Sequence, residues 1–408
     1  MTQTIKLSFV GDMLCQQPQL KKLAKEGVGY DTVFEKVKPL FQDSDYVIGN
    51  LETPVAPSQR FSYELMCFNA PIDFIAAMRR AGIDFVSTAN NHIWDRGPKG
   101  LDETLQSLRL VGLDTTGAYD QKDVSDKIFV KEIGGVRVAI IACTYEINYG
   151  RPHERMTQDM EWKVDLLKKP LPYPRSYWFP IRRALSNLFP IEFKFRIRRI
   201  LSSLHSARRS TYCAECVPAS EIGKPEHEAY RLRVENKIRR AKKQSDIVIV
   251  LPHIGGQHNP SPGRYHEYTM QWMADAGADL IVAGHAHVPQ KAFCLANGTF
   301  VAYCLGDFVF SMVEDRFNTG FETNASIVIN VYIDCDTKKI VKANFVPCLV
   351  AEGTASPQPL IDLYRLANES EREKLEIDNE TIVRSVRGGV LPVRVRSSYE
   401  IPVGTSVI

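Results

Sequence analysis

Short apolar segments alternate with helical patterns over the first 145 residues and again after residue 233. Buried strands read as nearly continuous apolar runs, and such runs predict strands at residues 5–10, 46–49, 85–89, 136–143, 246–251, 279–283, 300–305 and 325–333. Apolar residues at helical spacing predict helices at residues 73–81, 101–110 and 268–276. Strands that alternate with helices are typical of a layered α/β fold.

The alternation stops between residues 150 and 232, a stretch rich in proline, aromatic residues and arginine. From residue 168 to residue 209, eleven Lys and Arg stand against the single acid Glu192. Because the whole chain has a net charge of +3, the remainder carries a charge of about −7. We interpret residues 1–149 and 233–350 as one domain, residues 150–232 as a basic and aromatic insertion, and residues 351–408 as a C-terminal extension.

The composition is that of a globular protein with a large core, since 44% of the 408 residues are hydrophobic and 24% are charged. The small net charge gives no general attraction to nucleic acid, and we expect none as a partner. Nine scattered cysteines do not indicate a disulfide framework, and Cys213 with Cys216 forms a lone C-x-x-C pair. We find neither an apolar run of membrane-spanning length nor a signal-peptide pattern, and therefore expect a cytoplasmic or peripheral membrane protein.

Five of the predicted strands end in residues that can bind a metal, and these residues are Asp12, Glu52, Asn91 with His92, His253, and His285 with His287. Binding sites in open α/β sheets form at the carboxyl ends of the strands, so these ends converge if the strands share one or two adjacent sheets. Carboxylates, an amide oxygen and imidazoles together suit Mn, Fe, Zn or Co better than Ca. A carboxylate shared by two such ions is typical of phosphoryl chemistry.

Each of these residues also has an ordinary explanation. Asp12 follows a glycine and can close a turn, Glu52 can begin a helix, and Asn91 can cap a turn. A lone strand-end histidine such as His253 is often a hydrogen-bonded structural residue. The run Gly-His-Ala-His at 284–287 is the most specific single element, and the whole set indicates metal more strongly than any member.

Six segments, in this order, resemble the CapA/PgsA-type poly-γ-glutamate capsule biosynthesis family, which is similar to the calcineurin-like metallophosphoesterases. They are F-V-G-D-M-L at 9–14, G-N-L-E-T-P at 49–54, A-G-I-D-F-V-S-T-A-N-N-H-I-W-D-R-G at 81–97, H-I-G-G-Q at 253–257, G-A-D-L-I-V-A-G-H-A-H-V-P-Q at 277–290 and Y-C-L-G-D-F-V-F at 303–310. The resemblance implies a bacterial protein with a metallophosphoesterase-like sandwich, in which two mixed β-sheets are flanked by helices, with the basic insertion added.

The resemblance also implies a metal-binding role for each strand-end residue. Asp12 and His287 hold one divalent ion, and Glu52 bridges to a second ion. That second ion is held by Asn91, His253 and His285.

The resemblance assigns the chemistry to His92, which stands over the ions as a general acid or charge stabiliser. Asp95 is a candidate to orient His92 or Asn91. We expect Asn50, Gln257 and His258 to contact an anionic substrate, which is a phosphoester or a polyanionic polymer.

This chain departs from ordinary metallophosphoesterases at several positions. They carry Asp-x-His in the first motif, whereas Met13 and Leu14 follow Asp12 here, so one ion lacks a histidine ligand. They also place Asp after the motif-three histidine, where this chain has Ile93. The capsule family often has Glu or Asp at the position of Gln257, and more often Asn at the position of Asp307, which we expect to support the site or close a turn.

His258 and His266 lie on the segment after His253. They either line the substrate pocket or are solvated loop histidines, and the second interpretation is the commoner one for loop residues. We expect one or two ions at the site, and their identity stays open between Mn, Fe, Zn and Co.

Three functions fit these observations. The first is a metallophosphoesterase-like hydrolase of capsule or poly-γ-glutamate metabolism that uses metal-activated water. The second is a non-catalytic accessory factor that binds an anionic polymer or a membrane surface. The third is a γ-glutamyl amide hydrolase or transferase. The basic stretch 168–211 could contact anionic lipid, form a groove for a polyanion, or cover the active site as a lid.

Overall fold

The computed structural model describes residues 3–15, 23, 25–59, 67–148, 155–170, 219–310, 324–351, 355–389 and 394–403. In these residues the strands are β1 (Thr4–Met13), β2 (Tyr46–Leu51), β3 (Phe85–Ser87), β4 (Asp114–Thr116), β5 (Phe129–Ile133), β6 (Val136–Thr144), β7 (Ile247–His253), β8 (Leu280–Val282), β9 (Ala292–Cys294), β10 (Phe300–Ala302), β11 (Asp307–Val309), β12 (Ala325–Asp334), β13 (Ile340–Val350), β14 (Pro357–Pro359) and β15 (Tyr399–Ile401). The α-helices are α2 (Asp31–Phe34), α3 (Ile72–Ala81), α4 (Gly97–Val111), α5 (Lys122–Ser125), α8 (Pro225–Lys242), α9 (Arg264–Asp275), α10 (Leu360–Leu366) and α11 (Glu369–Arg387). Short 3-10 helices are η1 (Lys38–Phe41), η2 (Gln158–Lys163) and η4 (Ala219–Glu221).

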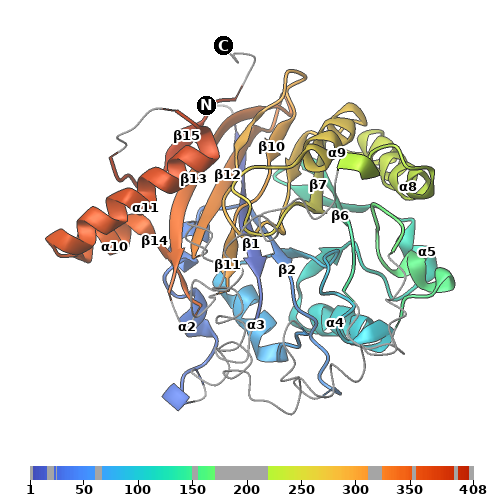
Figure 1. Ribbon diagram of the computed structural model, residues 1–408, viewed down its shortest axis with the longest axis horizontal. Helices are drawn as coiled ribbons and strands as arrows, with labels where there is room; N and C mark the ends of the chain where they lie inside the picture. Colours follow the sequence, from blue (N-terminus) through green and yellow to red (C-terminus); the bar gives the residue numbers. More distant parts are fainter. Residues whose placement is uncertain are drawn as a thin grey trace, which may run out of the picture.

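The described strands form two mixed sheets (Figure 1). The first has the order β14-β13-β12-β1-β2-β3-β4, with β11 added beside β1 and β15 beside β13. The second has the order β5-β6-β7-β8-β10-β9. Strands β1 to β4 run parallel to one another, as do β6, β7, β8 and β10, so the carboxyl ends within each group lie at one edge.

Strands β6 and β7 alternate between two apolar clusters, because successive side chains of a strand point to opposite faces. Ile140 and Ile249 belong to the cluster that also contains Phe9 of the first sheet. Ile141 and Val250 belong to a second cluster, which α8 and α9 complete. Both faces of these strands are therefore buried, which explains why their sequences read as unbroken apolar runs.

Helices cover the outer faces of both sheets (Figure 1). Helices α8 and α9 pack on the second sheet through Val234, Ile238, Met270 and Met273. Helices α10 and α11 pack beside β13 at the far end of the first sheet. The predicted layered α/β sandwich of two mixed sheets with flanking helices is confirmed.

All eight predicted strands and all three predicted helices occur, with shifted ends. Helix α3 ends where predicted, since Gly82 takes a left-handed conformation with φ of 106° and its N–H donates to the carbonyl of Arg79. Helix α4 begins at Gly97, earlier than predicted, because Pro98 fits the first helical turn although it is not apolar. Helix α9 likewise begins at Arg264, one turn before the first apolar residue considered.

The predicted insertion, residues 150–232, and the predicted C-terminal extension, residues 351–408, both contain elements that the structure describes. Val164 and Leu166 form bridges to Ala118 and Thr144, and α8 begins at Pro225. In the C-terminal region, β14 and β15 pair with β13. Residues 171–218, which contain the pair Cys213 and Cys216, and residues 390–393 lie outside the described residues. The division into domains stays a prediction.

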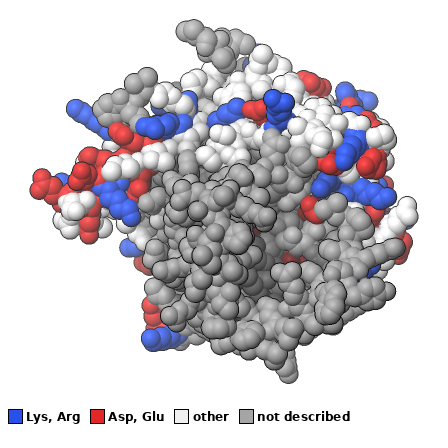
Figure 2. All heavy atoms as spheres, viewed as in Figure 1, with Lys and Arg blue, Asp and Glu red and all other residues white. Residues whose placement is uncertain are grey.

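Acidic and basic side chains are interspersed over α8, α10 and α11 on the face shown in Figure 2. Helix α11 begins with a capping box, in which Asn368 accepts from the N–H of Glu371 while the Glu371 carboxylate accepts from the N–H of Asn368. Among the described helices, none combines the length and the apolar character that a membrane crossing requires.

Candidate metal centre

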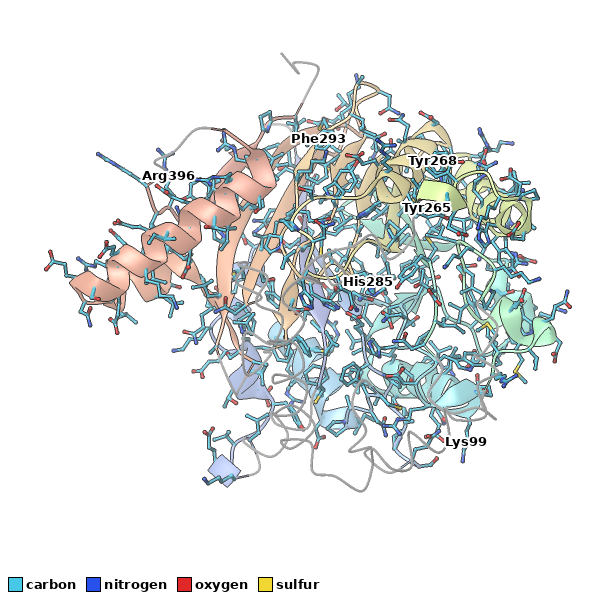
Figure 3. All side chains as sticks on the ribbon, in the orientation of Figure 1. Lys99, Tyr265, Tyr268, His285, Phe293 and Arg396 are labelled. Carbon is cyan, nitrogen blue, oxygen red and sulfur yellow. The ribbon has the colours of Figure 1, made fainter. Side chains whose placement is uncertain are left out.

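The six predicted metal ligands meet at the carboxyl ends of strands from both sheets. Asp12 lies at the end of β1, Glu52 directly follows β2, and His253 ends β7. Asn91 follows β3, and His285 and His287 follow β8. All six side chains are buried, with at most 6% of any residue exposed. His285 lies centrally, between the two sheets, in Figure 3.

Four of these ligands bring one atom each toward a common point. The Nε2 atom of His253 lies 2.8 Å from Oδ1 of Asn91, 3.0 Å from Nδ1 of His285 and 3.2 Å from Oε1 of Glu52. Two ligands that bind one ion at about 2.1 Å are separated by about 3 Å. A single imidazole nitrogen has at most one proton and cannot bond all three neighbours, whereas a shared cation satisfies all four atoms.

A second group lies on the other side of Glu52. Asp12 Oδ2 is 3.8 Å from Nδ1 of His287, and Nε2 of His287 is 4.0 Å from Oε1 of Glu52. Ligand atoms within 4.8 Å of one another form three sets, which are Glu52 with His285 and His287, Asp12 with Glu52 and His253, and Asp12 with His287 and Asp307. Glu52 thus belongs to sets on both sides, which is the position of a bridging carboxylate.

Unpaired oxygens mark this cluster as short of positive charge. Both carboxylate oxygens of Glu52 and Oδ2 of Asp307 are buried without a hydrogen-bond partner. Within the described part of the chain, the ion pairs of Asp12, Glu52 and Asp307 are made with histidines. Burying three carboxylates beside histidines alone is costly, and one or two divalent ions would supply further positive charge. The residues therefore fit a divalent metal.

The pKa values follow from this burial and crowding. Burial raises the pKa of Asp12, and the Glu52 carboxylate raises it further. Burial also raises the pKa of Glu52, but positive charge on His253 and His287 outweighs burial and brings this pKa to about 2. Burial lowers the pKa of His287, whereas Asp307 and Glu52 together raise it to about 10. Without metal, the site thus holds a proton on His287 to balance its carboxylates.

The Gly-His-Ala-His turn carries a strained backbone. His285 has φ of 94° and His287 has φ of 59°, both in the left-handed region that side chains rarely adopt. Such residues persist only where their surroundings hold them, and they cluster at functional sites. Gly284 is required because a Cβ atom there would lie 2.5 Å from Oδ1 of Asp12.

His92 and Asp95 form a buried pair beside the cluster. His92 Nδ1 is 2.8 Å from Oδ2 of Asp95, which also accepts the N–H of Phe68 at 2.7 Å. The ring of Phe68 lies 4.5 Å from the ring of His92, and Asn148 Nδ2 is 3.4 Å from His92 Nε2. Burial lowers the pKa of His92, but the Asp95 carboxylate outweighs burial, and the net pKa is raised. Of the two partners considered for Asp95, the structure places it against His92.

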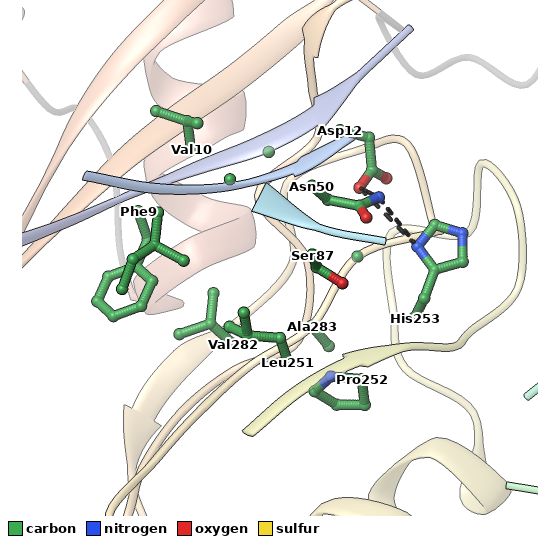
Figure 4. A pocket seen from close by; sticks show the side chains of 14 residues that line it. Phe9, Val10, Asp12, Asn50, Ser87, Leu251, Pro252, His253, Val282 and Ala283 are labelled. Carbon is green, nitrogen blue, oxygen red and sulfur yellow. Dashed lines mark hydrogen bonds and ion pairs between the residues drawn. The ribbon is translucent and has the colours of Figure 1, made fainter. Parts of the chain in front are cut away.

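The three predicted substrate residues differ in position. Asn50 lies inside the cluster, where its Nδ2 donates to Oδ1 of Asp12 at 2.8 Å and lies 3.3 Å from Nδ1 of His253 (Figure 4). His258 is buried, and its ring is nearly parallel to that of His287 with centroids 5.7 Å apart. Gln257 is partly exposed. Their contact with substrate stays a prediction.

The interpretation of His258 and His266 as solvated loop histidines is wrong. Their exposed fractions are 3% and 2%. His266 lies in the first turn of α9, with its ring 4.8 Å from the ring of Tyr303. Burial lowers the pKa of each to about 3, so both imidazoles are neutral at ordinary pH. His266 is buried because α9 begins earlier than its apolar pattern indicates, and His258 is buried because its loop packs against the turn that carries His287, with the N–H of His258 donating to the carbonyl of Ala286 at 2.7 Å.

Sequence reasoning did not find Tyr145. Its hydroxyl lies 3.1 Å from Nε2 of His285, so it fixes the ring whose Nδ1 faces the cluster. The signal available was its position two residues after the predicted strand 136–143. That position was not enough, because the contact joins residues 140 positions apart.

A family model described as "Bacterial capsule synthesis protein PGA_cap" matches residues 6–312, well over half of the chain. The chain belongs to this family. The match begins at β1 and extends just past β11, so it includes every residue of the cluster. The resemblance that the six sequence segments carried is therefore confirmed.

Two curated relatives have names of the same kind. The chain is 27% identical over 311 residues to "PGA biosynthesis protein CapA" of Bacillus subtilis (strain 168), covering 75% of this chain and 63% of that relative. It is 25% identical over 362 residues to "Capsule biosynthesis protein CapA" of Bacillus anthracis, covering 87% of this chain and 70% of the relative. The chain thus spans less than two thirds of the first relative's length.

Solved structures resemble the chain more distantly. The calcineurin-like phosphoesterase YfkN of Bacillus subtilis shares 13% identity and a TM-score of 0.39, covering 93% of this chain and all of that chain (100%). A phosphatase of Mycoplasma pneumoniae shares 13% identity and a TM-score of 0.43, covering 91% of this chain and 99% of its own.

Proposed function

We propose that this member of the capsule synthesis family is a hydrolase that depends on divalent metal. The observation that carries the proposal is the approach of His253 Nε2 to ligand atoms of Asn91, His285 and Glu52 at 2.8 to 3.2 Å. Asp12 and His287 complete a neighbouring group that shares Glu52. The donors are mixed oxygen and nitrogen atoms, which suit Mn, Fe, Zn or Co.

Ions bound at such a site polarise the bond under attack and activate water as the nucleophile. The protein's own contribution centres on His92. The Asp95 carboxylate accepts from Nδ1 of His92, which leaves Nε2 as the atom that exchanges a proton. The raised pKa of His92 keeps a proton available for a leaving oxygen or nitrogen. Phe68 and the surrounding burial exclude water from the pair.

The substrate class that we propose is a phosphoester or related bond in capsule or poly-γ-glutamate metabolism. Family membership and the relatives' names support the setting. A second candidate is cleavage or transfer at a γ-glutamyl amide. The same buried centre favours it, because metal-activated water attacks carbonyl carbon as well as phosphorus. His92 would then protonate the leaving amine.

Binding without catalysis is the alternative for the basic stretch. Its residues 171–211 lie outside the described residues, and contact with a membrane or an anionic polymer stays a prediction. Lys168 belongs to the folded body, since its side chain is 6% exposed and lies over the ring of Tyr145. A deletion should therefore begin after residue 170. Unchanged binding of liposomes and poly-γ-glutamate by this deletion variant would remove that contact surface from consideration.

The proposal is tested by metal analysis of the purified protein, joined to hydrolysis assays on a phosphodiester and on a γ-glutamyl peptide with added Mn²⁺. We expect bound metal, activity lost on chelation and restored by metal, and preference for one substrate class. His92→Asn should keep the metal and lower the rate about 10²- to 10⁴-fold. His227→Asn is the matched control, because His227 pairs with Glu221 outside the metal cluster. A protein that takes up no metal and melts unchanged with chelator would refute the proposal.

A further inference from the structure

Asp307 stands beside Asp12 because two strands approach unusually closely. Strand β11 pairs parallel to β1 with Asp307 opposite Asp12, and the N–H of Asp12 donates to the carbonyl of Gly306 at 3.1 Å. A Cβ atom on Gly11 would collide with that carbonyl oxygen. Gly306 itself has φ of 79°. The two glycines thus allow a second aspartate to enter the cluster from a strand about 300 positions later in the chain.

The Asp307 carboxylate contacts one metal-site histidine. Its Oδ1 accepts from Nδ1 of His287 at 2.7 Å, which is the length of a charge-assisted hydrogen bond. Its Oδ2 is buried and has no hydrogen-bond partner. Asp307 as a whole is 0% exposed. A role limited to closing a turn would not require this burial.

The contact determines which nitrogen of His287 can bind metal. An ionised carboxylate only accepts, so the proton of His287 resides on Nδ1 and the lone pair resides on Nε2. That Nε2 faces Oε1 of Glu52 at 4.0 Å, a separation that two ligands on one ion can have. Carboxylate–histidine–metal arrangements fix both the tautomer and the ring direction in this way.

The ion expected at Asp12 and His287, called the first ion below, has special need of such support. Leu14 stands where metallophosphoesterases carry a histidine, and it packs with Phe68 and Phe310 in a small apolar cluster. The Phe310 ring also lies nearly parallel to the ring of His287, with centroids 6.1 Å apart. Apolar side chains therefore fill the place of the missing ligand, and more of the binding depends on His287 and Asp12.

We propose that Asp307 is a positioning residue for the first ion, which holds His287 through Nδ1 and adds a third negative charge beside Asp12 and Glu52. The proposal rests on the proposed metal-dependent function. It assigns to Asp307 no contact with the reacting atoms. Its effect reaches the ion through the direction and basicity of the His287 ring.

The test compares the wild type with Asp307→Asn and Asp307→Ala by metal count per chain and by Mn²⁺ titration. We expect Asp307→Ala to weaken the first ion about 10- to 100-fold and to leave the second ion unchanged. The Mn²⁺ affinity of Asp307→Asn at the first ion should lie between those of the wild type and Asp307→Ala. An amide oxygen can accept from Nδ1 of His287, but it lacks the negative charge. Unfolding of the metal-free variants is measured beside the metal count, so that a general loss of folding stability is told apart from a selective loss of the first ion.

The control is Asp334→Asn. Asp334 is 6% exposed and caps a turn by accepting the N–H groups of Asp336 and Thr337, at the opposite end of β1 from Asp12. The Asp334→Asn variant should lower the free energy of unfolding and leave both ions bound. Unchanged Mn²⁺ affinity in Asp307→Ala, or a loss of metal-free stability with both ions weakened equally, would overturn the positioning role. If the wild type itself binds no metal, the proposed function fails as well.

Discussion

Gly284→Ala tests how closely the Gly-His-Ala-His turn is fitted to Asp12. The added Cβ would lie 2.5 Å from Oδ1 of Asp12, whereas such atoms essentially never approach within 3.0 Å. The carboxylate must therefore retreat by about half an ångström, and this movement is not free because hydrogen bonds hold both of its oxygens. The backbone of Gly284 does not need a positive φ, so the perturbation is steric.

The retreat has two consequences. Asp12 is held by the N–H of His285 at 2.9 Å and by Nδ2 of Asn50 at 2.8 Å, and both bonds lengthen when the carboxylate moves. Overpacking of this kind costs about 1–3 kcal/mol of folding stability. A metal–ligand bond tolerates a displacement of only about 0.2 Å, so we expect the first ion to be lost while the ion at His253 is retained.

The assay combines metal count per chain with denaturant unfolding in the presence and absence of Mn²⁺. Gly29→Ala is the matched control, because a Cβ at Gly29 has no atom within 4 Å and its backbone is not strained. We expect the control to match the wild type in both measurements. Full occupancy of the first ion in Gly284→Ala would show that the Asp12 contact does not limit metal binding, and the steric reasoning would then be wrong.

Three further predictions follow from the site. Tyr145→Phe removes the hydroxyl that holds Nε2 of His285 and should weaken the second ion about tenfold in a competition titration, leaving the first ion unchanged. In chelator, the raised pKa of His287 contributes stability that is complete below pH 6.5 and is lost as the pH rises toward about 10; unfolding of His287→Asn should show a flatter pH profile over this range. Saturating metal should raise the melting temperature of the wild type, and a chelator should reverse the gain.

The sequence located the residues that meet in the cluster better than the residues that hold them in place. The clustered residues stand at strand ends, and apolar runs locate strand ends directly, so the sequence was enough to predict that Asp12, Glu52 and His253 come together. The supports are set by how strands from distant parts of the chain align. Tyr145 meets His285 across 140 positions, and this alignment leaves no periodic signal in the sequence.

The start of α9 and the burial of His266 also depend on contacts that leave no pattern in the sequence. The first turn of α9 carries few apolar residues, and the burial of His266 there results from packing against Tyr303 on the adjacent sheet. Asp95 could be named but not paired, because Asn91 and His92 were both within reach of a turn. Only the folded turn brings its carboxylate to His92 at 2.8 Å.

The position of β1 bears on how this protein must be made. Its first strand pairs with β2 on one side and with β12 on the other, and Ser8 Oγ bonds Asn330 across 322 positions. A nascent chain has no β12 until more than 300 further residues have been translated after β1, so β1 meanwhile has an unpaired edge that other chains can join. Such non-local pairing also slows folding. We therefore expect refolding yield to fall as protein concentration rises, and truncation before residue 325 to give aggregates instead of a smaller folded unit.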